Sequence, residues 1–341
     1  MFKLFAVAVH FFQRQLRSIP VPTTSYAGRT VIVTGANGGL GLESARHFAR
    51  LGAARVILAC RSTERGEAAK ADIERTLTTS STTVLEVWPL DLCDYASVRE
   101  FCRRADRELD RLDVLLANAA MLTMGSPQMV DGWEMQVFVN VLANFLMVFL
   151  LLPLMRRTAA KWNVEPVVTV VSSEAHILTK FVEQDEPRIL ESFRPGRAMH
   201  DRYGTTKLLD VLLVQELAER LDAANAGVSS IVVNTANPGL CESRLFRDIH
   251  TVAQALLSVA KFFFGRTSEE GSRALMAAVA AGRASHGKYV DSGKVDDQSP
   301  FARSEKGKEV QKKVWDELVT TLCWQADVEP CIDPNVTRIA G

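Results

Sequence analysis

Two side chains in the stretch "YGTTK", Tyr203 and Lys207, are of types and spacing that could carry out acid–base chemistry. Four positions along a helix place both side chains on one face. A phenol has a pKa of about 10, and a nearby ammonium group stabilises the phenolate and lowers that pKa. We therefore expect Tyr203 to donate a proton near working pH and Lys207 to adjust its acidity.

A second candidate is a glycine cluster, "TGANGGLG" at 34–41, which follows the apolar run at 30–34. Glycine costs backbone entropy, so such a cluster needs a reason. A flexible tip is one reading, and a backbone that turns sharply beside a phosphate is the other. The strand–turn–helix setting favours the second, because it aims the free N–H groups of a helix N-terminus at a phosphate. The cradle is predicted to comprise Gly35, Asn37, Gly39, Leu40 and Gly41.

The elements that would position these residues alternate between strand and helix. Strands are predicted at 30–34, 55–59, 84–87, 113–117, 167–171 and 231–235, and helices at 40–51, 63–77, 95–109, 133–156 and 203–224. The strands are apolar throughout, as expected of a parallel sheet covered on both faces. The predicted fold is α/β, with one doubly wound, Rossmann-type parallel sheet.

The chain is predicted to divide into three parts. Residues 1–25 form an N-terminal amphipathic helix and linker, 26–295 a nucleotide-binding catalytic domain, and 296–341 a C-terminal extension with a helix at 304–323. Two segments, about 177–200 and 241–266, follow the carboxyl ends of strands, where ligands bind in open α/β sheets. We expect them to be substrate-covering loops.

The N-terminal helix leaves two readings open. Bulky apolar residues recur at steps of three and four between Phe2 and Ile19, the pattern of an amphipathic helix. The helix either packs on the body of the protein or lies on a membrane surface, with Lys3, Arg14 and Arg17 facing anionic lipid. The apolar run at 145–155 is too short to span a bilayer and is predicted to be a buried core helix.

Composition narrows the function classes. Forty basic and forty acidic side chains cancel, so no global positive field favours nucleic acid. The six cysteines are scattered without a C-x-x-C pair, which argues against a metal site and a disulfide framework. We expect a cytoplasmic protein without a metal, with membrane association left open.

The motifs T-G-x-x-x-G-x-G at 34–41 and Y-x-x-x-K at 203–207 resemble those of the short-chain dehydrogenase/reductase family. The resemblance runs from about residue 26 to 295. The segments "TGANGGLG" and "ACRS" and the long interval before Tyr203 resemble the retinol-dehydrogenase and WW-domain-oxidoreductase branch. Fungal natural-product tailoring reductases share these features.

The resemblance implies roles for further residues. In "VVTVVSS" the family's V-S-S ending favours Ser173 over Ser172 as the catalytic serine, and "VNVLANF" supplies Asn140, which would hold a relay water. Cofactor contacts are implied for Asp91, Leu92, Asn118, Pro238, Gly239 and Ser243, besides Tyr203 and Lys207.

Cofactor choice follows from the residue after the second strand. An acid there would bind the ribose hydroxyl of NAD, but the sequence is "ILACRS", and Arg61 lies twenty residues beyond Gly41. An arginine suits a 2′-phosphate, so the predicted cofactor is NADP(H).

The resulting hypothesis is an NADPH-dependent reductase that transfers a hydride to a carbonyl of a bulky, lipophilic substrate. A polyketide, a terpenoid or a retinoid-like ketone or aldehyde of secondary metabolism would fit. A non-redox enzyme on the same scaffold (isomerase, dehydratase or cyclase) and an NADP(H)-sensing binding protein are the alternatives. A homodimer is also left open.

Overall fold

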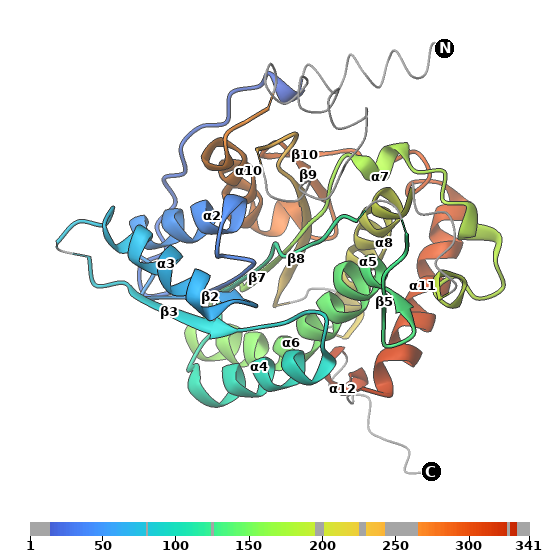
Figure 1. The fold of residues 1–341 in the computed structure, drawn as a ribbon, viewed down its shortest axis with the longest axis horizontal. Coiled ribbons are helices and arrows are strands. Elements are labelled where there is room, and N and C mark those ends of the chain that lie inside the picture. The colour runs from blue at the N-terminus through green and yellow to red at the C-terminus, as the bar shows by residue number, and fades with distance from the viewer. Residues whose placement is uncertain are drawn as a thin grey trace.

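The computed structural model of the chain describes residues 14–79, 81–123, 126–194, 201–224, 230–242, 265–325 and 328–332. Its centre is an eight-stranded sheet with the order β10-β9-β8-β7-β4-β1-β2-β3 (Figure 1). The strands are β1 (Thr30–Thr34), β2 (Arg55–Cys60), β3 (Val84–Pro89), β4 (Val114–Ala117), β7 (Val167–Val171), β8 (Val232–Asn237), β9 (Tyr289–Asp291) and β10 (Lys294–Asp296). The pairings from β3 to β9 are parallel, and β10 pairs antiparallel with β9.

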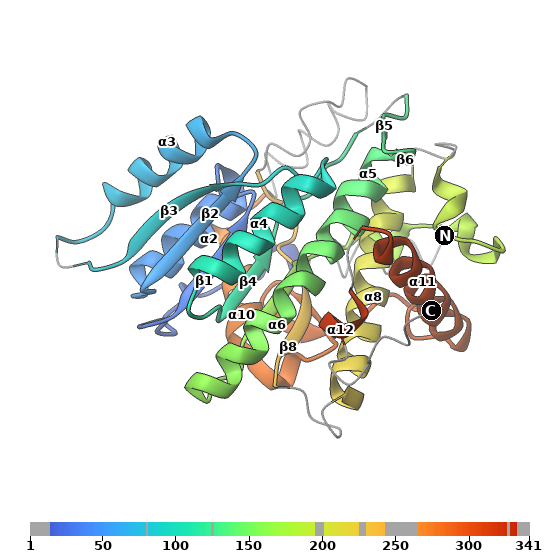
Figure 2. The ribbon, with the colours of Figure 1, turned by 90° about the horizontal axis from the view of Figure 1, so that it is seen from below.

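Helices cover both faces of this sheet (Figure 2). One face carries α2 (Gly39–Arg50), α3 (Thr63–Glu74) and α10 (Ser268–Ala280), and the other carries α4 (Tyr95–Glu108), α6 (Asn144–Trp162) and α8 (Arg202–Ala224). Each face has its own cluster of buried apolar side chains. Every residue of β1, β4 and β7 is buried, which is why these strands read as continuous apolar runs. The predicted doubly wound α/β fold is confirmed.

Four features were absent from the sequence prediction. The sheet continues past β8 into β9 and β10, and a small hairpin, β5 (Met129–Val130) with β6 (Trp133–Glu134), precedes the long helix. The long helix also extends beyond its predicted end at residue 156, to Trp162. Its start is irregular: after the short α5 (Met135–Val137), residues Phe138–Ala143 form a π-helical segment.

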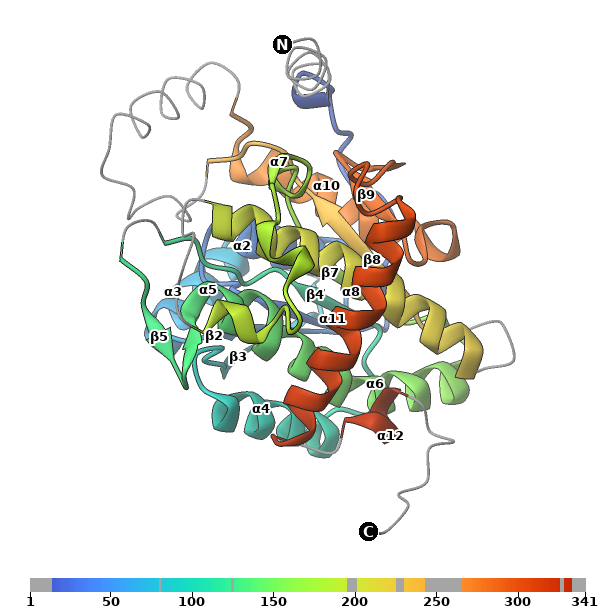
Figure 3. The same cartoon turned by 90° about the vertical axis from the view of Figure 1, so that its right-hand side faces the viewer.

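C-terminal helices cover the outer side of α6 and α8. Helix α11 (Glu305–Cys323) runs along α8, and α12 (Glu329–Ile332) contacts α6 (Figure 3). The Trp315 ring lies 5.4 Å from the Phe149 ring, centroid to centroid. The helix spanning Met135–Trp162 is long and apolar enough to cross a membrane, but 89% of its most apolar window is buried. It is a core helix, as predicted.

The described end of the N-terminal segment is fastened to the body of the protein. Arg14 is buried and forms ion pairs of 2.8 Å with both Asp291 and Asp296. Gln15 exchanges two hydrogen bonds with the backbone of Leu240. Arg14 is therefore not available to lipid headgroups, which corrects one part of the membrane reading; residues 1–13 lie outside the described residues.

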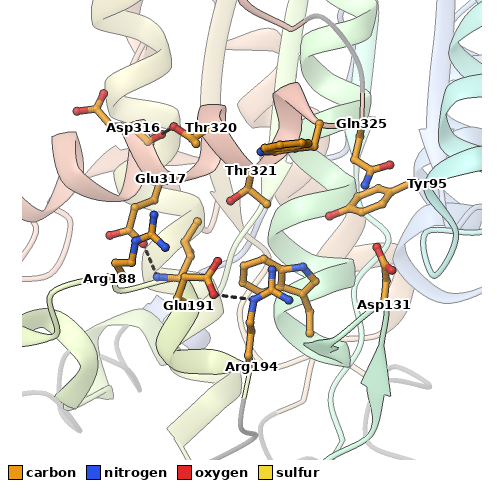
Figure 4. A pocket seen from close by; sticks show the side chains of 13 residues that line it. Tyr95, Asp131, Arg188, Glu191, Arg194, Asp316, Glu317, Thr320, Thr321 and Gln325 are labelled. Carbon is orange, nitrogen blue, oxygen red and sulfur yellow. Dashed lines mark hydrogen bonds and ion pairs between the residues drawn. The ribbon is translucent and has the colours of Figure 1, made fainter.

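The insertion at 177–200 is described up to residue 194. It begins with α7 (Ala175–Leu178), which packs on α8, and continues to α11, where the Glu317 carboxylate accepts the backbone N–H groups of Ile189 and Leu190. A cavity of about 700 Å³ opens between this insertion and α11 (Figure 4). Its walls include Arg188, Glu191 and Arg194 from the insertion and Asp316, Thr320 and Thr321 from α11, and none of the predicted site residues lines it. The role of the 177–200 insertion as a substrate-covering loop stays a prediction.

Candidate active site

Tyr203 and Lys207 lie on the first turns of α8, as their spacing predicts. The Lys207 Nζ lies 5.8 Å from the centre of the Tyr203 ring. The lysine is buried, and its ammonium group donates to the carbonyl of Val171 at 2.8 Å and to the carboxylate of Asp210 at 3.0 Å. The end of β7 and the next turn of α8 thus fix the ammonium group close to the phenol.

The two serines at the end of β7 have different surroundings. Ser172 is buried, and its hydroxyl donates to the backbone carbonyl of Lys207 at 2.9 Å. The Ser173 side chain is partly exposed and hydrogen-bonds the Tyr203 side chain. Only the second serine thus faces the phenol, which is the geometry that the choice of Ser173 requires.

The pKa of Tyr203 differs from the sequence expectation. Lys207 and Ser173 do lower it, but desolvation by the surrounding protein is the larger effect, and the net pKa is raised above its usual value. In this structure the phenol therefore keeps its proton at neutral pH, a state in which it can only donate that proton to a substrate.

Asn140 lies in the π-helical segment and is fully buried. Its side-chain amide accepts the backbone N–H of Met121 at 2.8 Å and donates to the Met121 carbonyl and to the Thr206 hydroxyl. Asn140 therefore ties the loop after β4 to the helix that carries Tyr203. The predicted role of Asn140 in holding a relay water stays a prediction.

The glycine cluster forms the predicted turn between β1 and α2. Gly35 and Gly39 have φ values of 66° and 57°, which favour glycine. A Cβ on Gly41 would lie 2.5 Å from the Gly35 carbonyl oxygen, so the first turn of α2 can press against the loop only without a side chain there. Asn37 and Leu40 lie partly buried in the same turn.

Asn118 holds this turn in place from the end of β4. Its side-chain amide donates to the Thr34 carbonyl at 2.8 Å, while the Thr34 hydroxyl accepts the backbone N–H groups of Asn118 and Ala119. The asparagine thus shapes the cradle, and a direct cofactor contact stays a prediction.

The remaining predicted cofactor residues lie around the carboxyl edge of the sheet. Pro238 and Gly239 follow β8, and Gly239 has a φ of 80° with Arg266 and Gln15 packed where a Cβ would lie. Asp91 and Leu92 follow β3, and Arg61 is exposed directly after β2. The charges of Arg61 and Asp91 both affect the pKa of the Cys93 thiol, so both side chains lie close to Cys93. Ser243 lies outside the described residues.

Sequence reasoning missed three charged residues near the candidate catalytic residues. Asp210 pairs with Lys207. Arg202, next to Tyr203, is buried and ion-paired with Glu183 at 2.9 Å. Glu174 follows Ser173, and burial raises its pKa to about 7. The sequence shows Asp210 three residues after Lys207, but only its burial in the structure indicates that the two side chains form a pair.

Known proteins resemble this chain over most of its length. A family model described as short chain dehydrogenase matches residues 29–182. The short chain dehydrogenase/reductase dmxR8 of Cryptosporiopsis sp. (strain 8999) is 40% identical over 332 residues, covering 96% of this chain and 98% of the relative. The short-chain dehydrogenase anuD of Penicillium roqueforti is 38% identical and covers 89% of this chain and 80% of the relative.

The chain belongs to the short-chain dehydrogenase/reductase family. It is therefore an oxidoreductase of this family, and its likeness to fungal members is confirmed. Among solved structures, the NADP active-site complex of RhlG from Pseudomonas aeruginosa has a TM-score of 0.61 at 26% identity, covering 79% of this chain and 96% of that one. A protein from Mycobacterium paratuberculosis has a TM-score of 0.62 at 28% identity, covering 87% and 94%.

The residues present fit the nicotinamide dinucleotide of this family. Glycine lets the first turn of α2 pack directly on the loop at Gly35, where a Cβ on Gly41 would collide with the Gly35 carbonyl oxygen. The free N–H groups of this first turn suit a pyrophosphate. The Lys207 ammonium has three N–H donors, of which two have acceptors among the described residues. One donor is left for a ribose hydroxyl.

Proposed function

We propose that this member of the family is an NADPH-dependent reductase that converts the carbonyl of a bulky, lipophilic small molecule to an alcohol. The observation that carries the proposal is the cluster of Ser173, Tyr203 and Lys207 at the end of β7. It lies at the carboxyl edge of the sheet, the side on which the glycine turn also opens. Secondary metabolism in the cytoplasm is the proposed setting.

Each side chain has a role that its surroundings support. The Tyr203 hydroxyl, protonated at neutral pH, gives its proton to the substrate oxygen, and the Ser173 hydroxyl hydrogen-bonds the same oxygen. The Lys207 ammonium stabilises the phenolate that remains, because opposite charges attract strongly in a desolvated site. When bound, NADPH would supply the hydride.

NADP(H) is proposed over NAD(H) because of Arg61. The side chain is exposed directly after β2, where an acid would be expected in an NAD enzyme. A guanidinium can bind a 2′-phosphate through two parallel hydrogen bonds. Asn140 supports the site by fixing the loop after β4 to α8.

A homodimer through the outer faces of α6 and α8 is not part of the proposal. The buried contacts of α11 and α12 occupy those faces. Contact of the first residues with a membrane also stays open, now without Arg14.

The test is the single substitution Tyr203→Phe, assayed by NADPH oxidation with a panel of polycyclic and aromatic ketones. Loss of a general acid lowers kcat by about 10²–10⁴-fold. NADPH binding, followed by cofactor fluorescence, should persist because the ring is retained. Tyr26→Phe is the matched control: Tyr26 is buried against Phe48 of α2 and is not one of the proposed site residues, so turnover should match the wild type. Unchanged turnover in Tyr203→Phe would sink the assignment.

A further inference from the structure

A buried carboxylate accompanies the lysine of the proposed site. Asp210 lies one turn beyond Lys207 on α8 and has no exposed surface. One carboxylate oxygen, Oδ2, accepts a hydrogen bond of 3.0 Å from Lys207 Nζ. The other, Oδ1, is buried and has no hydrogen-bond partner among the described residues.

A buried carboxylate with so few partners is costly. Removing an ionised carboxylate from water is strongly unfavourable, and only a close opposite charge can offset that cost. Lys207 is the only cation with which the described residues pair Asp210. Among the described residues Asp210 has no other charged partner, so Lys207 alone offsets the cost of burying its charge, and the carboxylate in turn favours the ammonium form of Lys207.

The pair also fixes where the ammonium group points. A lysine ammonium has three N–H donors. Val171 on β7 takes one and Asp210 on α8 takes another. Two acceptors on different elements hold Nζ in one place, and the third N–H is left for the active site.

We propose that Asp210 is a positioning residue: it keeps Lys207 in its ammonium form and directs the remaining N–H of that group toward the active site. Its effect on turnover rests on the proposed reductase function, whereas its effect on Lys207 does not.

The charges around the pair determine the expected pH dependence. Burial lowers the pKa of Lys207 and is the largest single effect, but the charge and hydrogen bond of Asp210 and the charge of Tyr203 together outweigh it, and the net pKa is raised. Burial raises the pKa of Asp210 to about 6 although Lys207 lowers it. Among the described residues, Tyr203 is the other titratable group whose charge bears on Lys207, whereas β7 contributes a carbonyl.

The pair therefore exists from about pH 6 upward, and Asp210 matters most in alkaline solution. Below that pH the protonated Asp210 resembles a neutral asparagine, and Lys207 is charged in either case. Above it, a protein with Asp210→Asn keeps a buried ammonium without a counter-charge, so Lys207 should lose its proton at a lower pH.

The experiment compares the full-length wild type with Asp210→Asn by NMR of [ε-¹³C]lysine-labelled protein. The Lys207 signal is assigned by its absence in Lys207→Arg. In the wild type this signal should stay at the ammonium position up to strongly alkaline pH, and in Asp210→Asn its midpoint should fall by at least ~1 pH unit. An unshifted midpoint would overturn the inference, whatever the enzyme reduces.

The kinetic arm measures kcat for ketone reduction against pH. Turnover of Asp210→Asn should match the wild type near pH 5.5 and fall behind it in alkaline solution, with the midpoint of that fall at the lowered Lys207 midpoint found by NMR, because a neutral lysine no longer stabilises the phenolate. An equal loss at every pH would reveal a merely structural role and contradict the inference. If the wild type reduces no carbonyl, the proposed function fails and the NMR arm still decides the role of Asp210.

Two further variants guard this comparison. Asp113→Asn is the matched control, because Asp113 is also buried and forms an ion pair with Arg111. Asp113 lies beside Thr30 at the amino ends of the strands, whereas the proposed site lies at their carboxyl ends. This control variant should lose stability without moving the Lys207 titration or the pH profile. Should Asp210→Asn not fold, Asp210→Ser removes the same charge and leaves room for water.

Discussion

At the scale of single residues, the neighbouring serines Ser172 and Ser173 have different surroundings. Ser172 is buried and satisfies a backbone carbonyl of α8, whereas Ser173 reaches the phenol of Tyr203. In sequence the two hydroxyls are equivalent, and only the family pattern favours one. Their separation follows from the alternation of side chains at the end of a strand.

Some of the candidate site residues could be predicted from the sequence, and others could not. Tyr203 and Lys207 follow from their spacing, because i and i+4 share a helix face. Asp210 does not, because an aspartate on a helix is usually solvated. Its significance depends on full burial beside the lysine, which only the packed structure contains.

The cofactor preference can be tested at Arg61. Substituting Arg61→Ala should raise the dissociation constant of NADPH about 10–100-fold, the equivalent of one charged hydrogen-bonding group, and leave that of NADH unchanged. Titrations followed by cofactor fluorescence measure both. Arg75→Ala, which removes an exposed arginine at the far end of α3, should change neither. Equal weakening of both cofactors would contradict the assigned preference.

At the scale of elements, α7 joins Ser173 to the C-terminal region. His176 on α7 is buried; its Nδ1 lies 2.7 Å from the Ser173 carbonyl, and its Nε2 accepts the backbone N–H of Ser299. This pairing requires a neutral ring with its proton on Nδ1. Burial is the main cause that lowers the pKa of His176 to about 4.

The low pKa makes His176 a source of acid sensitivity. The unfolded histidine, with a pKa of about 6.5, binds a proton before the folded one does, so its contribution is complete above pH 6.5 and is lost as pH falls toward 4. The loss amounts to about 3 kcal/mol at most. Urea unfolding at pH 7 and pH 4.5 should give a smaller pH-dependent loss for His176→Asn than for the wild type. Equal losses in the two proteins would contradict this account.

The elements themselves were predictable where burial leaves a strong pattern. Most of the six predicted runs are buried strands, because parallel strands covered on both faces need apolar sequence, whereas β3 at the edge of the sheet is partly exposed. Strands β9 and β10 have three residues each, and such short strands are stabilised by pairing at the sheet edge more than by their own sequence. The π-helical turn around Asn140 is likewise invisible in an apolar run whose every residue is buried.

At the scale of the whole molecule, the N-terminal segment is part of the folded body. Arg14 reaches Asp291 at the end of β9, and Asp291 accepts a hydrogen bond from Asn237, which in turn accepts the N–H of Gly239. A residue far outside the glycine and tyrosine motifs thus supports the loop after β8. Sequence alone could not pair Arg14 with an acid nearly three hundred positions away.

Substituting Arg14 should greatly lower the free energy of unfolding. Arg14→Met leaves Asp291 buried without its counter-charge, at a cost of about 3–5 kcal/mol. The loss should be smaller at pH 5 than at pH 8, because burial raises the pKa of Asp291 and the carboxyl is then more readily neutralised. Chemical denaturation at both pH values measures it. Arg17→Met is the control, since Arg17 forms no ion pair within the described part of the chain, and a loss equal to that of Arg14→Met would refute the argument.

The central claim, hydride transfer from NADPH to a carbonyl, can be tested by isotope transfer. The full-length protein is incubated with [4-²H]NADPH, prepared separately as each of the two C4 epimers, and with the ketone panel, and the products are analysed by mass spectrometry. The account predicts an alcohol that carries one deuterium from one of the two epimers, with one NADPH oxidised per product, and no such product from Tyr203→Phe. Substrate conversion without deuterium transfer or NADPH consumption would contradict the account and favour a non-redox enzyme on this scaffold.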